Sequence, residues 1–461
     1  MVFSSIPFLY YFLPAVLAVY FLTPRKGKNA VLLLASLIFY GWGELRLLPL
    51  MAFTILLCYV CGLGIERSRK RKKLWLLASI VISVGLLGVF KYADFFIGSL
   101  NAVTGLKIPL LHLALPIGIS FYTFQCLSYT IDVYRGSVPA QKNLINFGAY
   151  VALFPQLIAG PIVRYADIAR ELEHREHSWE NAAVGLRRFL VGLGKKVILA
   201  DNFALLIRLF RQSGEKSVLF YWMYAVAFTL NIYFDFSGYS DMAIGLGRML
   251  GFRFLENFNY PFLADSITDF WRRWHISMGT WFRDYVYIPL GGNKGGLAKQ
   301  LRNIAIVWLL TGFWHGASWN FVLWGVYFGI LLVLEKLFLL RWLKRLPAVL
   351  RHIYALVLVT ISWTLFAFTE ISKGAAWCKA MFSGVPFDSG SLYLLLTYGP
   401  MLAICALAAT PLGKRFYEKL GTRLGQRALT VVDCGGLACV LVMAAAYLVS
   451  GSYNPFLYFR F

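Results

Sequence analysis

The segment that decides the fold reads 268-TDFWRRWHISMGTWFRDYVYIPLGGNKGGLAKQLRNIAIVWLLTGFWHGASWNFVLWG-325. It contains His275, which follows two arginines, and His315, which lies inside a strongly apolar run. Ionisable side chains inside apolar runs of membrane length are costly, and they mark functional sites by default. The segment therefore predicts a site built on two histidines, with the rest of the chain as its membrane scaffold.

The composition is that of a membrane protein. Hydrophobic residues make up 59% of the 461 residues and charged residues only 15%, against about 25% charged residues in soluble proteins. Several apolar runs approach the roughly 20 residues that cross a bilayer. The sequence predicts an all-α, polytopic fold with about eleven transmembrane helices plus re-entrant segments. We expect one membrane domain over residues 1–461, with its motif core at about 115–330.

The formal net charge of +23 is explained by topology rather than by nucleic acid. Cytoplasmic loops of membrane proteins collect lysine and arginine. The basic runs 24-PRKGK-28 and 67-RSRKRKK-73 are both placed in the cytoplasm by this rule, which puts the N-terminus outside. The second run could also hold anionic lipid head groups, although a topology anchor is the favoured interpretation.

Two apolar stretches contain predicted breaks. Residues 144–165 are interrupted by prolines and a glycine, which indicates a re-entrant segment, because broken helices occur where they face protein or water. Residues 303–340 are too long for one crossing, so we expect a break near Gly312, Gly316 or Ser318. That break would place His315 at or beside a helix end.

Other polar positions leave alternatives open. The helix predicted within 115–136 carries many hydroxyl and amide side chains, which either bond helices together or line a cavity. His174 and His177 are three residues apart with glutamates nearby, but a solvated helix face is favoured over a metal site there. No metal and no bound cofactor is predicted.

The histidines suit acid–base chemistry. A buried neutral imidazole can take the proton of an attacking hydroxyl, and we favour this role for His315 over that of a packed core histidine. His275 could be a second acid or base, could orient a substrate, or could lie at the interface. Neighbouring cations suit either phosphates, including those of a thioester's nucleotide tail, or lipid head groups: Arg272, Arg273, Arg283 and Lys294.

Further substrate-binding candidates lie in and beside the same motifs, and Asp235 lies where a plain scaffold would carry leucine or valine. No Ser-His-Asp order and no G-x-S-x-G elbow is present, so a covalent serine mechanism is not supported. The full set of substrate-binding candidates is Arg272, Arg273, Trp274, Trp314, Asn320 and Asp235.

Nearly the whole chain resembles the membrane-bound O-acyltransferase (MBOAT) family, in the branch that O-acetylates alginate and other polysaccharides. The resemblance is specific, because several long motifs carry it. They are 86-LLGVFKYADFF-96, 115-LPIGISFYTFQCLSYTIDVYRG-136, 152-ALFPQLIAGPIVRY-165, 233-YFDFSGYSDMAIGLGRMLGFRF-254, 269-DFWRRWHISMGTWFRDYVYIPLGG-292, 311-TGFWHGASWNFVLWG-325 and 454-NPFLYFRF-461.

The resemblance implies a ring of helices around a central tunnel in a bacterial cytoplasmic membrane. An acyl thioester, in the first instance acetyl-CoA, would enter from the cytoplasm and an extracytoplasmic polysaccharide would approach from the other side. The family's essential histidine falls on His315 in its W-H-G motif, and its second histidine falls on His275 in W-R-R-W-H. An exported or membrane-anchored partner resembling SGNH esterases is also implied.

Two other functions stay open from the sequence. D-alanyl transfer from a carrier protein to teichoic acid belongs to a related branch of the family. A transporter or lipid flippase would also use broken helices and a polar interior. The two histidines favour chemistry over transport.

Overall fold

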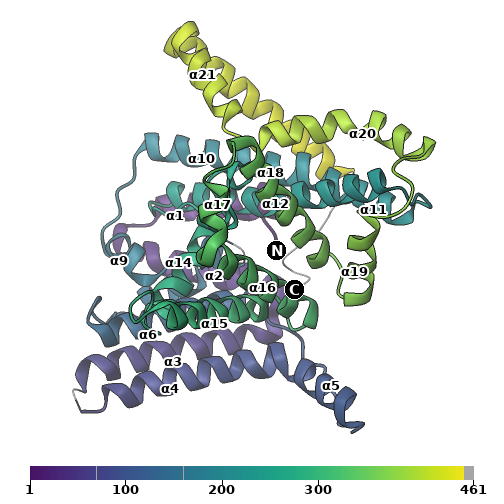
Figure 1. Ribbon diagram of the computed structural model, residues 1–461. Coiled ribbons are helices and arrows are strands. Elements are labelled where there is room, and N and C mark those ends of the chain that lie inside the picture. The colour runs from purple at the N-terminus through teal and green to yellow at the C-terminus, as the bar shows by residue number, and fades with distance from the viewer. Residues whose placement is uncertain (69, 159, 451–461) are drawn as a thin grey trace. The chain divides into compact units, whose positions relative to one another are not determined.

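The computed structural model describes residues 1–450 apart from 69 and 159, so the predicted C-terminal motif 454–461 lies outside the described residues. The chain forms two compact units. Unit 1 comprises Met1–Phe189 and Tyr239–Leu255, and unit 2 comprises Leu190–Gly238 and Glu256–Phe461. The described part is helical, as predicted, with one isolated antiparallel bridge between Phe258 and Trp274 (Figure 1). The prediction of one membrane domain stays a prediction.

Unit 1 is built from short and long helices that follow one another closely. Its described helices are η1 (Pro7–Phe12), α1 (Leu13–Leu22), η2 (Arg25–Gly27), α2 (Lys28–Glu44), η3 (Leu45–Leu47), α3 (Leu48–Arg67), α4 (Lys72–Leu87), η4 (Gly88–Tyr92), α5 (Ala93–Thr104), α6 (Ile119–Arg135), α7 (Leu144–Ala152), α8 (Phe154–Leu157), α9 (Tyr165–Glu173), most of α10 (Trp179–Gly194) and the end of α12 (Val218–Met249) from residue 239.

Unit 2 shares the long helix α12 with unit 1, because the unit boundary falls at residue 238 inside that helix. The described helices of unit 2 are the end of α10 from residue 190, η5 (Lys195–Ala200), α11 (Asp201–Gln212), α12 (Val218–Met249, to residue 238), η6 (Pro261–Leu263), α13 (Ile267–Arg273), α14 (Ile276–Phe282), η7 (Arg283–Tyr287), α15 (Leu297–His315), α16 (Trp319–Leu334), η8 (Glu335–Leu339), α17 (Leu340–Leu343), α18 (Ala348–Phe366), α19 (Ile371–Ala380), α20 (Ser389–Ala408) and α21 (Leu412–Val449).

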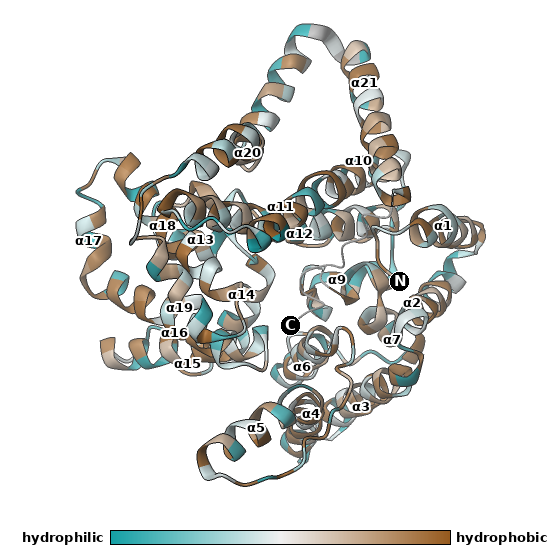
Figure 2. Cartoon of the chain, turned by 90° about the vertical axis from the view of Figure 1, so that its right-hand side faces the viewer, coloured by the Kyte–Doolittle hydropathy of each residue, from teal (hydrophilic) through white to brown (hydrophobic). Residues whose placement is uncertain are grey.

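Seven helices of the described chain are long and apolar enough to cross a membrane, and the shorter helix Pro7–Leu22 is also apolar. Figure 2 shows hydrophobic residues along helices such as α3 and α4. The outer face of α4 exposes Leu74, Leu77 and Val81, as expected of a surface that lipid covers. The protein is therefore a multi-pass membrane protein. The predicted eleven crossings and the tunnel stay predictions.

The polar helix α6 is buried within unit 1, and its polar groups bond neighbouring helices. The Ser79 hydroxyl on α4 donates to Thr130 Oγ1 at 3.1 Å, and the Tyr150 hydroxyl donates to the Gln125 carbonyl at 3.3 Å. These hydrogen bonds join helices in a setting where lipid offers no partners. Between the two alternatives left open for 115–136, these contacts favour helix association.

The break predicted within 144–165 is present. Helix α7 ends at Ala152, and Leu153 leaves the helical conformation before the one-turn helix α8. Buried side chains form hydrogen bonds with backbone groups at the break. Phe154 N–H donates to the Ser36 hydroxyl at 3.0 Å, and the Gln156 side-chain amide donates to the Tyr150 carbonyl at 2.6 Å. The broken backbone is thus tolerated because protein surrounds it.

Helices α15 and α16 form a tight hairpin that requires glycine. A Cβ on Gly312 would lie 2.5 Å from the Phe321 carbonyl oxygen, and a Cβ on Gly325 would lie 2.4 Å from the Trp308 carbonyl oxygen. Small residues let membrane helices approach this closely. The hairpin fixes the place of His315, the last residue of α15.

We predict that Gly312→Ala destabilises the protein by about 1–3 kcal/mol, because the new methyl group meets backbone atoms that cannot move aside. The midpoint of thermal unfolding, followed by size-exclusion chromatography, measures the effect. Gly85→Ala is the matched control, since a Cβ on that helical glycine meets nothing within 4 Å. Equal melting points for the two variants would contradict the close-packing argument.

Candidate active site

His315 closes α15 inside an aromatic enclosure in unit 2. The chain leaves the helix at Gly316, whose extended backbone (φ −178°) ends α15 and confirms the predicted break. The His315 side chain is buried, and its ring packs on Trp314, Trp324 and Phe366 at centroid separations of 4.9, 4.8 and 5.6 Å. The imidazole therefore lies among aromatic rings inside the protein.

His275 occupies the turn between α13 and α14 and is fully buried. Its backbone adopts the left-handed conformation (φ 47°), which is uncommon for a residue other than glycine. A short antiparallel pairing holds this turn: Asn259 N–H donates to the Arg273 carbonyl at 2.9 Å, and Ile276 N–H donates to the Asn257 carbonyl at 3.0 Å. Non-glycine residues in this conformation persist where the surrounding structure fixes them, which is common at functional sites.

A buried carboxylate anchors the start of α13. Glu335 Oε1 accepts from Ile267 N–H at 2.7 Å, and Oε2 accepts from Thr268 N–H at 2.8 Å and from its hydroxyl at 2.6 Å. A negative charge at a helix N-terminus satisfies free N–H groups and opposes the helix dipole. Since Glu335 directly follows α16, the two histidine-bearing segments are joined to each other.

Asn257 fixes the tautomer of His275. Asn257 Oδ1 accepts from the Ser277 hydroxyl at 2.9 Å and from Ser277 N–H at 3.3 Å, and it lies 3.1 Å from His275 Nδ1. Because this oxygen can only accept, the neutral ring must carry its proton on Nδ1. His275 Nε2 is then a lone-pair acceptor. It is buried and has no hydrogen-bond partner among the residues that the structure describes.

The two histidines meet at one indole ring. Trp314 packs against His275 at 5.6 Å and against His315 at 4.9 Å between ring centroids. Phe236 covers another side of His275 at 4.7 Å with its ring perpendicular. The structure thus brings together three of the predicted residues, His275, Trp314 and His315. Trp314 and His315 lie 39 and 40 positions after His275 in the chain.

The other predicted candidates fall into different environments. Trp274 is fully buried, 4.9 Å from the Trp363 ring, and its indole Nε1 has no partner among the described residues. Asn320 is buried in the first turn of α16, and neither polar atom of its amide has a described partner. Arg272 is exposed, whereas Arg273 forms an ion pair with Asp269 at 2.8 Å.

Asp235 belongs to a buried charge cluster within unit 2. Lys196 Nζ lies 2.7 Å from Asp235 Oδ1 and 2.9 Å from Asp201 Oδ1, and all three side chains are nearly inaccessible. Charges in a membrane interior are retained when they pair with one another. The geometry gives Asp235 a structural partner, and its predicted contact with substrate stays a prediction.

Residues 34–372 match the family described as MBOAT, membrane-bound O-acyltransferase family. This match covers well over half of the chain. The chain belongs to the membrane-bound O-acyltransferase family. It is therefore a membrane O-acyltransferase, and the two histidines described above lie within the matched region.

Relatives support the same assignment. The chain is 39% identical over 499 residues to the probable alginate O-acetylase AlgI of Azotobacter vinelandii, and the alignment covers all of both chains. It is 30% identical over 517 residues to the peptidoglycan O-acetyltransferase of Helicobacter pylori, covering all of this chain and 98% of the relative. The teichoic acid D-alanyltransferase of Bacillus subtilis is 28% identical over 59% of this chain and 69% of its own length.

Sequence reasoning missed the residues that surround the histidines of this O-acyltransferase. Asn257 lies 18 positions before His275 in an irregular stretch, and no periodic pattern marks it. Trp324, Trp363 and Phe366 look like ordinary apolar helix residues in the sequence. Only the packing of α15, α16 and α18 brings Trp324 and Phe366 to the His315 ring, with Trp363 packed behind them. Among the described residues, no group of three His, Cys, Asp or Glu side chains could hold a metal ion.

We predict that Asn257→Ala lowers the acyl-transfer turnover number by about tenfold or more, because His275 loses the acceptor that sets its tautomer. The Michaelis constant for the donor should change little. Asn257→Asp should restore most of the turnover, since a carboxylate still accepts from Nδ1–H. A loss of stability equal in both variants, with no difference in turnover between them, would show that Asn257 only supports the fold.

We predict that Lys196→Met destabilises the protein by about 3–5 kcal/mol, because two buried carboxylates lose their counter-charge. Thermal unfolding of the purified protein measures this. Lys195→Met, one position away and half-buried, is the control and should be much milder. If Asp235 instead serves the substrate, Asp235→Asn should abolish turnover while leaving the melting point unchanged, which contradicts a structural role.

Proposed function

We propose that this O-acyltransferase moves an acetyl group from a cytoplasmic thioester, acetyl-CoA, to a hydroxyl of an extracytoplasmic polysaccharide. The observation that carries the proposal is the buried pair of imidazoles at Trp314, in a family defined by acyl transfer to oxygen. The acceptor receives the group directly or through an exported partner that resembles SGNH esterases. The bacterial cytoplasmic membrane is the proposed location.

The relatives favour acetyl over D-alanyl transfer. The proteins named as alginate O-acetylase and peptidoglycan O-acetyltransferase align with the entire chain. The D-alanyltransferase aligns with little more than half of it and at lower identity. The acetylase names also support a polymer outside the cytoplasm as the acceptor. A tunnel through the protein would let the acyl group cross while the bulky donor stays inside.

The proposed acyl transfer requires the movement of one proton. The acceptor hydroxyl attacks the thioester carbonyl carbon, a C–O bond forms and the C–S bond breaks. His315 takes the hydroxyl proton as the bond forms and returns it to the leaving thiolate, which departs as a free thiol. A positioned general base of this kind contributes about 10²–10⁴-fold to the rate.

His275 contributes a hydrogen-bond acceptor. Its Nδ1–H is committed to Asn257, so Nε2 can only accept while the ring is neutral. A donor that meets this atom is held in a fixed direction. The acceptor substrate, rich in hydroxyl groups, supplies such donors. His275 is therefore proposed to position the substrate and to stabilise positive charge that develops beside it.

Donors are also available for the thioester oxygen. The Asn320 amide and the Trp324 indole Nε1 are buried and lack partners among the described residues. Trp324 packs directly on His315, and Asn320 follows the turn after it. N–H groups that point at a developing oxyanion in a water-poor site lower the barrier substantially. This supports the predicted role of Asn320 in substrate binding.

We predict that His315→Ala abolishes thiol release from acetyl-CoA while the purified protein stays folded. The assay compares wild type and variant in detergent or nanodiscs, with a soluble oligosaccharide acceptor and with or without the exported partner. His352→Gln is the control, because His352 lies on α18 with its Nδ1 hydrogen-bonded to the Ala264 carbonyl at 3.0 Å. The control should retain full activity.

Two results would overturn parts of this proposal. Full activity of His315→Ala would remove the assignment of the general base. Thiol release from a D-alanyl carrier protein but not from acetyl-CoA would replace the donor and favour D-alanyl transfer. Both results leave the family membership intact.

A further inference from the structure

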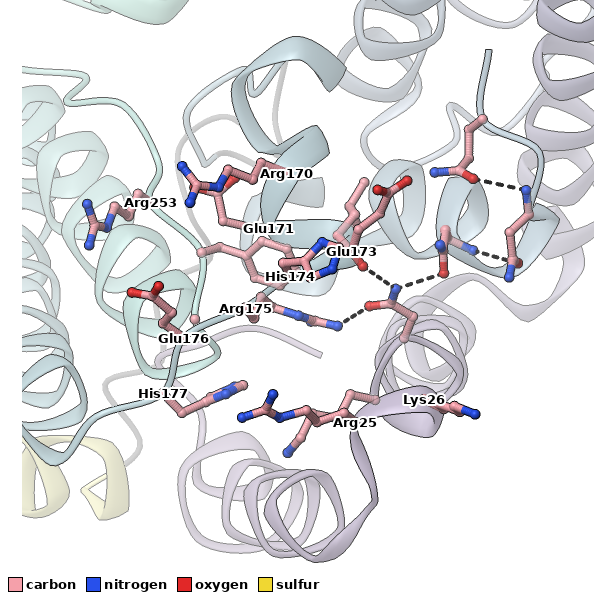
Figure 3. A pocket seen from close by; sticks show the side chains of 18 of the residues that line it. Arg25, Lys26, Arg170, Glu171, Glu173, His174, Arg175, Glu176, His177 and Arg253 are labelled. Carbon is pink, nitrogen blue, oxygen red and sulfur yellow. Dashed lines mark hydrogen bonds between the residues drawn. The ribbon is translucent and has the colours of Figure 1, made fainter. Parts of the chain in front are cut away.

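Unit 1 contains a large polar cavity that the proposed chemistry does not use. Its volume is about 1180 Å³, above the roughly 300–1,000 Å³ of typical small-molecule sites. Residues from five segments line it: the α1–α2 connection with the start of α2, the residues before and in the first turn of α7, the stretch from α9 through His177, Asn181 of α10, and the end of α12 with the residues after it (Figure 3). All of them belong to unit 1.

The lining is strongly basic. Eight lysine and arginine side chains face three glutamates: Arg25, Lys26, Lys28, Lys142, Arg170, Arg175, Arg248 and Arg253 against Glu171, Glu173 and Glu176. Within the described part of the chain, none of these cations forms an ion pair with any carboxylate. If these cations only balanced the charge of the glutamates, we would expect them to form ion pairs with those carboxylates. Their gathering in a concave site instead leaves net positive charge facing the cavity.

Several of the basic groups are held in place by aromatic rings and by neutral partners. The Arg175 guanidinium stacks 4.7 Å from the Phe252 ring and donates to Asn29 Oδ1, while its buried Nη1 has no described partner. Lys28 Nζ lies 4.2 Å from the centre of the Tyr20 ring and donates to the Tyr20 carbonyl at 2.8 Å. These contacts fix the cations without neutralising them.

The positive charges that line the cavity act on His177. The Tyr20 hydroxyl donates to the Leu250 carbonyl at 2.7 Å, so its oxygen accepts from His177 Nε2 at 2.9 Å. Partial burial lowers the pKa of His177, and the charges of Lys28 and Arg175 lower it further, because like charges oppose another proton. A ligand that carries negative charge would relieve this repulsion.

We propose that this cavity binds a ligand bearing several phosphate groups. Lysine and arginine forks match phosphate oxygens, and the amides of Asn143 and Asn146 add neutral donors. Only Leu172 and Phe252 among the lining residues are apolar, so the bound part of the ligand is hydrophilic and an acyl chain would lie elsewhere. The single phosphate of a buffer ion would fill little of the volume.

Two sources share this chemistry. One is the nucleotide portion of a CoA-type donor, and this source rests on the proposed function. The other is the head group of an anionic phospholipid, which is independent of it. The exposed Phe21 and Leu22 of unit 1 end the apolar helix just before Arg25, where a lipid head group would lie.

Binding rather than turnover tests the proposal. Adenosine 3′,5′-bisphosphate, which carries phosphates as CoA does but no thioester, is titrated calorimetrically into the full chain in neutral detergent. Phosphatidylglycerol and phosphatidylcholine are compared by native mass spectrometry. We expect saturable binding of the nucleotide or selective retention of the anionic lipid. The first result identifies the donor's nucleotide as the source, and the second identifies lipid.

Charge reversal locates the site. Arg170→Glu with Arg253→Glu changes two exposed cavity side chains and should weaken binding about tenfold or more. Lys344→Glu with Arg345→Glu makes the same change in net charge on exposed residues between α17 and α18 and should leave binding unchanged. Equal weakening in both double variants, or no binding of either probe to the wild type, would overturn the proposal.

The His315→Ala protein separates this inference from the proposed function. It should bind the probe as the wild type does, even though it releases no thiol. If acetyl-CoA proves not to be the donor, retained binding of phosphatidylglycerol still supports the cavity as a phosphate site. Loss of binding in His315→Ala would contradict a site confined to unit 1.

Discussion

A lipid bilayer offers no hydrogen-bond partners, and this constraint shapes the interior of the protein. The hydroxyls of α6, the cluster of Lys196 with its two aspartates, and the Glu335 cap on α13 each pair polar groups inside the chain. Polar atoms without a described partner are therefore informative. Around the histidines of unit 2 they include Nε2 of His275, the Asn320 amide and the Trp324 indole. Groups that the fold leaves unsatisfied in such a place are available to a substrate.

The sequence was sufficient for the fold class and for the helix end at His315. Apolar runs of membrane length indicate helices, and the excess length of 303–340 indicates a break, which falls one residue after His315. These predictions succeed because they rest on local rules of length and composition. The surroundings of the imidazoles could not be predicted in the same way. Asn257 contacts His275 over 18 positions and Phe366 contacts His315 over 51 positions in the chain, and no local pattern records such contacts.

Amino-acid composition does not predict where the basic residues gather in the structure. Counting lysine and arginine attributes the net charge to topology, and for an exposed turn such as 71–73 that attribution stays a prediction. It does not explain why the cations of the α1–α2 connection and those after α9 line one cavity without carboxylate partners. The two histidines His174 and His177 also line this cavity, and no group of three His, Cys, Asp or Glu side chains that could hold a metal ion is found among the described residues. The placement of the basic residues around a cavity, and not their number in the sequence, distinguishes a binding site from a topology signal.

The carboxylate of Glu335 has a mechanical consequence. It follows α16 directly, and it holds the first turn of α13 through two backbone N–H groups and one hydroxyl. The hairpin that ends at His315 and the turn that carries His275 are thus clamped at their bases as well as touching at Trp314. A movement that opened the site by sliding one segment would have to break a buried charged contact. Moving side chains around a rigid frame therefore costs less free energy than separating the two imidazoles, and we expect the substrate to enter in that way.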